Sequence, residues 1–277
     1  MTRVLSAVVL LLLAVAPVWF ASAPVFFVAG ELLLVLAFAE YLSLARASHH
    51  PVPALPACVA AMLVFASFAR AAVGGVAVPL DVVLLSALVA LGALTLPRWQ
   101  GGGASGPGAA RADGADALGL AGVGLFPSLY LGLPLGAMVA VREARGPAAL
   151  SLLMLTVIVS DTAQYYTGRA FGRRLLAPAI SPKKTVAGAV GGFVFGALLL
   201  AVLGAWWLPE VPVALRAVFG AAIVALGIAG DLFESMLKRS AGVKDSSALI
   251  PGHGGVLDRI DALLFAAPVY YVVLKYV

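Results

Sequence analysis

Long apolar runs follow one another along almost the whole chain, and they limit the folds that are open to it. They lie at about residues 4–20, 24–44, 57–72, 78–96, 118–141, 147–172, 187–208, 213–232 and 257–276. Most have the length that an α-helix needs to cross the hydrocarbon core of a bilayer. Because lipid offers no partners to backbone polar groups, we expect these spans to be helices. The sequence therefore predicts an all-α, polytopic integral membrane protein with about nine transmembrane helices.

The composition excludes several other classes of protein. Hydrophobic residues make up 62% of the chain, whereas ordinary soluble domains are about 45–50% apolar. Cys58 is the single cysteine, which excludes a disulfide framework and a thiolate metal site. The basic residues form short clusters between the apolar runs and no extended patch, which argues against nucleic-acid binding.

A glycine-rich segment divides the chain. Residues 98–117 contain few large apolar side chains, so we expect a flexible cytoplasmic linker. It separates four N-terminal transmembrane helices in residues 1–97 from a C-terminal catalytic region in residues 118–277. Residues 4–20 could instead be a secretory signal peptide, but Pro24 and a second apolar run follow at once. We therefore interpret the first two runs as a helical hairpin.

Polar residues and prolines inside the apolar runs give further expectations. The second run contains Glu31 and Glu40. We expect Glu31 to bond to a neighbouring helix, and Glu40, near the end of its run, to reach the interface by snorkelling. Pro127 and Pro134 lie in the run at 118–141 and predict a kinked or broken helix.

The densest group of charged residues lies between 231 and 261. Helical spacing places four polar side chains on one face at the end of an apolar run: Asp231, Glu234, Ser235 and Lys238. Asp258 and Asp261 follow at i, i+3 spacing at the start of the last run. Carboxylates suit a hard cation such as Mg²⁺, and the adjacent lysines and arginines suit phosphates. A solvated loop whose charges pair with one another is the alternative, but acidic residues inside helix ends are more often functional.

The spacing of this segment extends over residues 235–261. It reads Ser235-x-Leu237-Lys238-Arg239-x4-Lys244-Asp245-x-Ser247-x2-Ile250-Pro251-x-His253-Gly254-Gly255-Val256-x-Asp258-Arg259-Ile260-Asp261. This pattern resembles the signature of the phosphatidate cytidylyltransferases, also called CDP-diacylglycerol synthases. Upstream, Asp161-Thr162, Gly168-Arg169 and the segment Ser181-Pro182-Lys183-Lys184-Thr185 are similar to the same family. The chain departs from the family at Ala187, where a glutamate is common. The resemblance covers roughly the C-terminal 160 residues.

The resemblance implies transfer of CMP from CTP to phosphatidate, which forms CDP-diacylglycerol and pyrophosphate in phospholipid biosynthesis. It implies catalytic roles for Asp231, Lys238, Arg239, Lys244, Asp258 and Arg259. Substrate contacts are expected from Asp161, Lys184, Thr185, Ser235, His253, Gly254 and Gly255. Mg²⁺, as one ion or as a two-ion clamp, is expected on Asp231, Asp258 and Asp261. The two glycines would let the backbone approach a phosphate closely, and His253 would donate to a phosphate or position the loop.

Two other functions compete with this interpretation. One is a CTP-dependent lipid or polyprenol kinase, against which the long signature argues. The other is an ion-coupled transporter that uses Asp161, Asp231 and Glu31 along a pathway. Transporters usually contain inverted repeats and helices broken at the midplane, whereas the charges here cluster towards one surface.

The distribution of basic residues predicts the orientation. With nine spans, 13 of the 18 lysines and arginines fall on the side that carries the N-terminus and both motif segments. The positive-inside rule makes that side cytoplasmic. We therefore expect a protein of the inner membrane whose active site faces the cytoplasm. Its expected partners are CTP, phosphatidate and the bilayer, with a homodimer as one option.

Overall fold

The computed structural model describes residues 12, 14–50, 52–72, 74–75, 79–93, 119, 121–250, 252 and 254–276. The predicted linker at 98–117, most of the first predicted span, and His253 lie outside the described residues.

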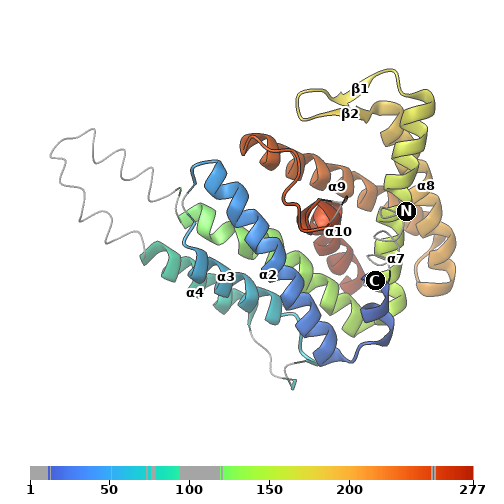
Figure 1. Ribbon diagram of the computed structural model, residues 1–277. Coiled ribbons are helices and arrows are strands. Elements are labelled where there is room, and N and C mark those ends of the chain that lie inside the picture. The colour runs from blue at the N-terminus through green and yellow to red at the C-terminus, as the bar shows by residue number, and fades with distance from the viewer. Residues whose placement is uncertain are drawn as a thin grey trace.

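Helices form almost all of the described structure (Figure 1). In chain order they are α2 (Ala23–Ala47), α3 (Ala54–Ala66), α4 (Leu80–Ala93), the π-helix η1 (Ser128–Gly132), α7 (Leu133–Phe171), α8 (Val186–Trp207), α9 (Val213–Ser240) and α10 (Leu257–Tyr276). Between α7 and α8 lie two strands, β1 (Leu175–Ala177) and β2 (Ser181–Thr185).

Four helical stretches are long and apolar enough to cross a membrane: Ala23–Ala47, Ala121–Phe171, Val186–Trp207 and Val213–Ser240. Helices α3 and α4 are shorter, with 13 and 14 residues, and the 20-residue α10 has charged residues near both ends. The prediction of a helical membrane protein is confirmed, whereas the count of nine spans stays a prediction.

The stretch Ala121–Phe171 contains the fifth and sixth predicted spans, and it breaks at Gly146. That residue has φ 82° and ψ 175°, a conformation that glycine tolerates because it has no Cβ. Pro147 then begins the next segment, where its missing N–H costs little. Pro127 and Pro134 flank η1, so the predicted distortion at these prolines is a turn of π-helix. The helix continues through it, and the full break comes only at Gly146.

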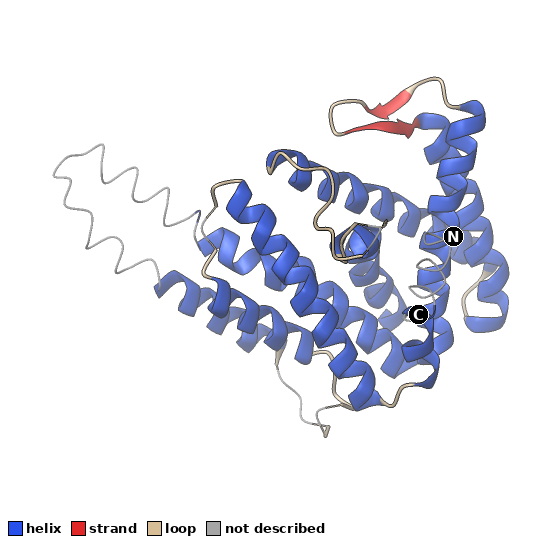
Figure 2. Cartoon of the chain, in the orientation of Figure 1, coloured by secondary structure: helices blue, strands red, loops and turns tan. Residues whose placement is uncertain are grey.

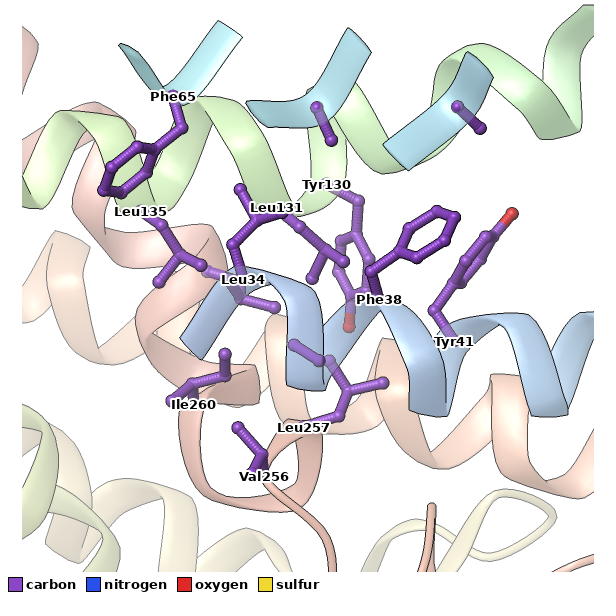
Figure 3. Packing of buried hydrophobic residues seen from close by; sticks show 14 of the residues in the cluster. Leu34, Phe38, Tyr41, Phe65, Tyr130, Leu131, Leu135, Val256, Leu257 and Ile260 are labelled. Atoms are coloured by element: carbon purple, nitrogen blue, oxygen red, sulfur yellow. The ribbon is translucent and has the colours of Figure 1, made fainter. Parts of the chain in front are cut away.

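A buried cluster joins the N-terminal helices to the start of α10 (Figure 3). Leu34 and Phe38 of α2 pack with residues of α3, η1 and α7, and with Val256, Leu257 and Ile260. Leu257 is fully buried. Packing against α2 therefore helps to fix the position of the first turn of α10.

Helices α7 to α10 pack against one another: α7 on α8, α9 on α8 and α10, and α10 on α7. A Cβ at Gly230 would lie only 2.5 Å from the carbonyl oxygen of Asp261. The absence of a side chain at this position thus allows α9 and α10 to approach closely. As a consequence, the segment that carries Asp231 lies beside the one that carries Asp261.

Strands β1 and β2 form an antiparallel hairpin with Leu175 opposite Thr185 and Ala177 opposite Ser181. The hairpin projects from the ends of α7 and α8 (Figure 2). Thr185 caps α8, because its Oγ1 accepts a hydrogen bond of 3.1 Å from the Gly188 N–H. This two-stranded hairpin is a small addition to the helical fold that the sequence did not predict, because its strands are too short to show a period.

The end of the molecule away from the hairpin is held together by contacts between connecting segments. Arg145, beside the break at Gly146, forms an ion pair of 2.8 Å with Glu210 in the α8–α9 turn. The same side chain donates a 2.6 Å hydrogen bond to the Leu274 carbonyl oxygen. Glu143 Oε2 accepts a 3.2 Å hydrogen bond from the Ala71 N–H. These segments were all predicted, from the distribution of basic residues, to lie on the non-cytoplasmic side, and in the structure they lie together.

Candidate active site

Two groups of charged and polar side chains meet along α9. One, which we name the open cluster, consists of Asp161, Lys184, Asp231 and Asp261. The other, which we name the closed cluster, consists of Glu40, Glu234, Lys238, Ser246 and Asp258. Helix α9 contributes to both, because Asp231, Glu234 and Lys238 recur at helical spacing.

The open cluster brings side chains from α7, β2, α9 and α10 together around Asp231. Lys184 Nζ lies 2.5 Å from Asp231 Oδ2, and these side chains are 19% and 33% exposed. The negative charge of Asp231 repels the carboxylates of Asp161 and Asp261, and these two carboxylates also repel each other. Carboxylates from three helices and one lysine therefore share this region, where Asp161 is exposed and Lys184, Asp231 and Asp261 are partly exposed.

Neighbouring polar groups orient the carboxylates of the open cluster. Gln164 Nε2 donates a 3.0 Å hydrogen bond to Asp161 Oδ1. Ser235 Oγ, one helical turn after Asp231, donates a longer bond of 3.4 Å to Asp231 Oδ1. The structure thus brings Asp161, Ser235 and Lys184 to Asp231, and their roles in substrate binding stay predictions.

The closed cluster is an internal ion-pair network. Lys238 Nζ forms ion pairs with Glu234 and, at 2.5 Å, with Asp258 Oδ1. The Glu234 side chain is fully buried, and those of Asp258 and Lys238 are only 6% and 11% exposed. Asp258 Oδ2 accepts hydrogen bonds from the Ser246 and Gly255 N–H groups and lies 2.8 Å from the Ser246 hydroxyl, whose single proton it shares with Glu40 Oε2. Both oxygens of Asp258 therefore have protein partners.

Glu40 of α2 belongs to this network, and its predicted snorkelling is wrong. The residue is 5% exposed. Its carboxylate accepts hydrogen bonds of 2.7–2.9 Å from the Ser246 and Ser247 hydroxyls and from the Val256 and Leu257 N–H groups. The sequence offered no signal for this contact, because the partners lie more than 200 residues away along the chain.

The two signature glycines approach carboxylates of the protein. Gly254 has φ 78°, and a Cβ there would lie 2.7 Å from Asp258 Oδ2. A Cβ at Gly255 would collide with Ser246 Oγ and with the Glu40 carboxylate. In this structure the carboxylates of Asp258 and Glu40 occupy the space beside the two glycines, and the predicted approach of this backbone to a phosphate stays a prediction.

The other described residues of the predicted site belong to neither cluster. Arg239 Nη1 donates a 2.9 Å hydrogen bond to the Val243 carbonyl oxygen, which ties the end of α9 to the following loop. Lys244 and Arg259 are exposed. Thr185 acts as the cap of α8 described above. Exposed basic side chains at this end of the molecule also include Arg169, Arg173, Arg174 and Lys183.

Comparison with known proteins places this arrangement in a family. Residues 1–277 match the cytidylyltransferase family. The chain belongs to that family. It is 47% identical over 126 residues to a phosphatidate cytidylyltransferase of Haemophilus influenzae, covering 44% of this chain and 43% of the relative. The enzyme of that name from Synechocystis is 48% identical over 124 residues, covering 43% and 41%.

A longer match is found with the Helicobacter pylori J99 phosphatidate cytidylyltransferase, which is 37% identical over 152 residues and covers 55% of this chain and 56% of the relative. The chain thus spans about half the length of the curated relatives that it matches.

In this cytidylyltransferase-family protein, the three predicted metal ligands fall into different clusters. Asp258 belongs to the closed cluster, whereas Asp231 and Asp261 belong to the open one. Within the described residues, no three histidine, cysteine or acidic side chains form a group that could hold a metal ion. Mg²⁺ needs fewer protein ligands than this, since it is usually bound by one or two carboxylates together with waters and substrate phosphates. The open cluster fits that requirement.

Proposed function

We propose that this protein transfers CMP from CTP to phosphatidate, forming CDP-diacylglycerol and pyrophosphate. The observation that carries the proposal is the open cluster, in which carboxylates of α7, α9 and α10 come together with Lys184 of β2. The curated relatives, which are named phosphatidate cytidylyltransferases, support the same reaction.

The reaction brings two polyanions together. An oxygen of the phosphatidate phosphate attacks the α-phosphorus of CTP, the bond from that phosphorus to the bridging oxygen breaks, and pyrophosphate leaves. A phosphate oxygen is already a nucleophile, so no general base is needed. Catalysis then consists of positioning the two substrates and neutralising their charge.

Lys184 and the basic side chains of the signature are suited to this neutralisation. Lys184 supplies a point charge beside Asp231, while the exposed Arg239 and Arg259 can contact two phosphate oxygens at once. Lys244 adds a further exposed positive charge. We assign these residues to the triphosphate and to the departing pyrophosphate.

We further propose that Asp231 and Asp261 hold Mg²⁺, with Asp161 close by. When bound, the ion would neutralise phosphate oxygens and favour in-line attack. Lys184 is already within ion-pair distance of Asp231, so it would lie next to a phosphate bound there. Asp258 supports the site from the closed cluster by holding Lys238 and the loop before α10.

The position of the label distinguishes the proposed reaction from its alternatives. With CTP labelled in the α-phosphate, we expect label in the lipid and release of pyrophosphate, both lost with excess chelator. A lipid kinase would transfer only γ-label and release CDP, and a transporter would transfer neither. Lipid labelled from the γ-phosphate alone would overturn the assignment.

We propose that the end of the molecule with the hairpin and the signature faces the cytoplasm. The excess of lysine and arginine at that end supports this orientation. So do the contacts that gather Ala71, Glu143, Arg145, Glu210 and Leu274 at the other end.

Cysteine labelling tests the orientation. In a Cys58→Ser background, a cysteine at the exposed Ala248 should react with a membrane-impermeant thiol reagent only after the inner face is opened. A cysteine at Glu210 should react from outside, and the Cys58→Ser protein itself should not react. Ala248 is chosen for labelling because it is exposed, whereas the nearby Ser246 in the same loop is buried and would react poorly. The reverse pattern would place the open cluster on the wrong side for CTP.

A further inference from the structure

One buried carboxylate of the N-terminal region gathers four hydrogen-bond donors from the signature loop. Glu40 accepts from the Ser246 and Ser247 hydroxyls at 2.8 and 2.7 Å. It also accepts from the N–H groups of Val256 and Leu257 at 2.9 and 2.8 Å. Glu40 therefore contacts both the middle of the segment that joins α9 to α10 and the start of α10 itself.

The hydrogen bonds between Glu40 and the start of α10 satisfy groups that would otherwise lack partners. A buried carboxylate is costly unless it is hydrogen-bonded, and the first N–H groups of a helix have no partner within that helix. Glu40 satisfies two such groups at the start of α10, where the helix dipole also favours a negative charge. Because Gly255 has no side chain, the carboxylate can come close enough to do this.

Glu40 is joined to the catalytic region through a continuous series of contacts. The Ser246 hydroxyl lies 2.8 Å from both Glu40 Oε2 and Asp258 Oδ2. Asp258 in turn pairs with Lys238, and Lys238 with Glu234 of α9. A displacement of the Glu40 carboxylate would therefore move the loop, Asp258 and the first turn of α10. Asp261 lies in the next turn of the same helix.

We infer that Glu40 is a positioning residue, which holds the signature loop and the start of α10 so that Asp261 faces Asp231. The inference rests on the proposed function, because the geometry that Glu40 fixes is that of the proposed phosphate and metal site. Glu40 acts through the loop, and the residues assigned to the substrates are others.

The test replaces Glu40 with glutamine, which keeps its size but turns one acceptor into a donor. That NH₂ group would face donors, so at least one of the Val256 and Leu257 amides should lose its partner. We expect kcat per folded molecule to fall about 100-fold, as for a misplacement of catalytic groups, with KM for CTP changed only a few-fold. Glu31→Gln, the same change on the same helix, is the matched control and should leave kcat unchanged.

Hydrogen exchange supplies a readout that does not depend on activity. In the Glu40→Gln protein, amides of residues 241–257 should exchange faster than in the wild type, whereas those of α7 and α8 should not change. A purely structural role would instead lower the yield of folded protein or raise exchange throughout, with a normal kcat in the folded fraction. Either of those outcomes, or unchanged exchange in the loop, overturns the inference.

Ser247→Ala is a milder second variant in case Glu40→Gln fails to fold. It removes one of four donors to a charged acceptor, so we expect a loss in kcat of about tenfold. The double variant should lose less than the product of the two single effects, because both changes disrupt one interaction. Strictly multiplicative losses would contradict the inference. If the wild type itself transfers no CMP, the proposed function fails, while loop exchange still decides whether Glu40 holds the loop.

Discussion

Replacing Asp231 with asparagine should reduce CMP transfer by about 10²–10³-fold, the range found when one electrostatic contact to developing charge is lost. The side chain lies at the centre of the open cluster, where it forms an ion pair with Lys184 and repels the carboxylates of Asp161 and Asp261. Asparagine keeps the shape but removes the charge that would bind Mg²⁺ and orient Lys184. The measurement is the rate of α-label transfer at saturating CTP, with the Mg²⁺ concentration varied.

The folded structure should tolerate this change, because the Asp231 side chain is partly exposed. Asp81→Asn provides the matched control: Asp81 is an exposed acid in the first turn of α4 and should be replaceable without loss of activity. Activity of Asp231→Asn within a few-fold of the wild type would remove this residue from the metal site.

Lys238→Met should destabilise the protein as well as inactivate it. The substitution leaves Glu234 and Asp258 buried without their common cation. Breaking a buried ion pair by removing one partner typically costs about 3–5 kcal/mol. A large fall in the unfolding temperature in detergent is therefore expected, together with loss of transfer.

Two further variants show whether the effect comes from the buried charges. Lys244→Met removes an exposed lysine and should change the free energy of unfolding by no more than about 0.5 kcal/mol. Adding Glu234→Gln to Lys238→Met removes one uncompensated charge and should restore part of the stability. An unfolding temperature of Lys238→Met equal to that of the wild type would mean that the network contributes nothing to the fold.

The sequence predicted the elements of the site better than the contacts within it. Helical spacing placed Asp231, Glu234 and Lys238 on one side of α9, and the last apolar run placed Asp258 and Asp261 at its start. Both predictions depend on local periodicity, which a single sequence contains. The division of these residues into two clusters depends on how α9 and α10 pack at Gly230, and no local pattern shows that.

The errors have a similar cause. Near the end of an apolar run, Glu40 satisfied the usual description of a snorkelling residue, and only its distant partners show otherwise. Gly254 and Gly255 were expected to let the backbone approach a phosphate, and the sequence could not show that the carboxylates of Asp258 and Glu40 lie beside them. The hairpin at 175–185 was missed because three- and five-residue strands leave too little alternation to detect.

The contact between Glu40 and the signature loop also has a consequence for biogenesis. Glu40 is synthesised more than 200 residues before the four donors that satisfy it. Until residues 246–257 emerge from the ribosome, its carboxylate has none of these partners, and burying it among α2 and its neighbours is unfavourable. Synthesis of residues 246–257 thus removes an energetic defect from a helix made near the beginning of this sequence. A nascent chain truncated before Ser246 keeps that defect, because it contains none of the four donors.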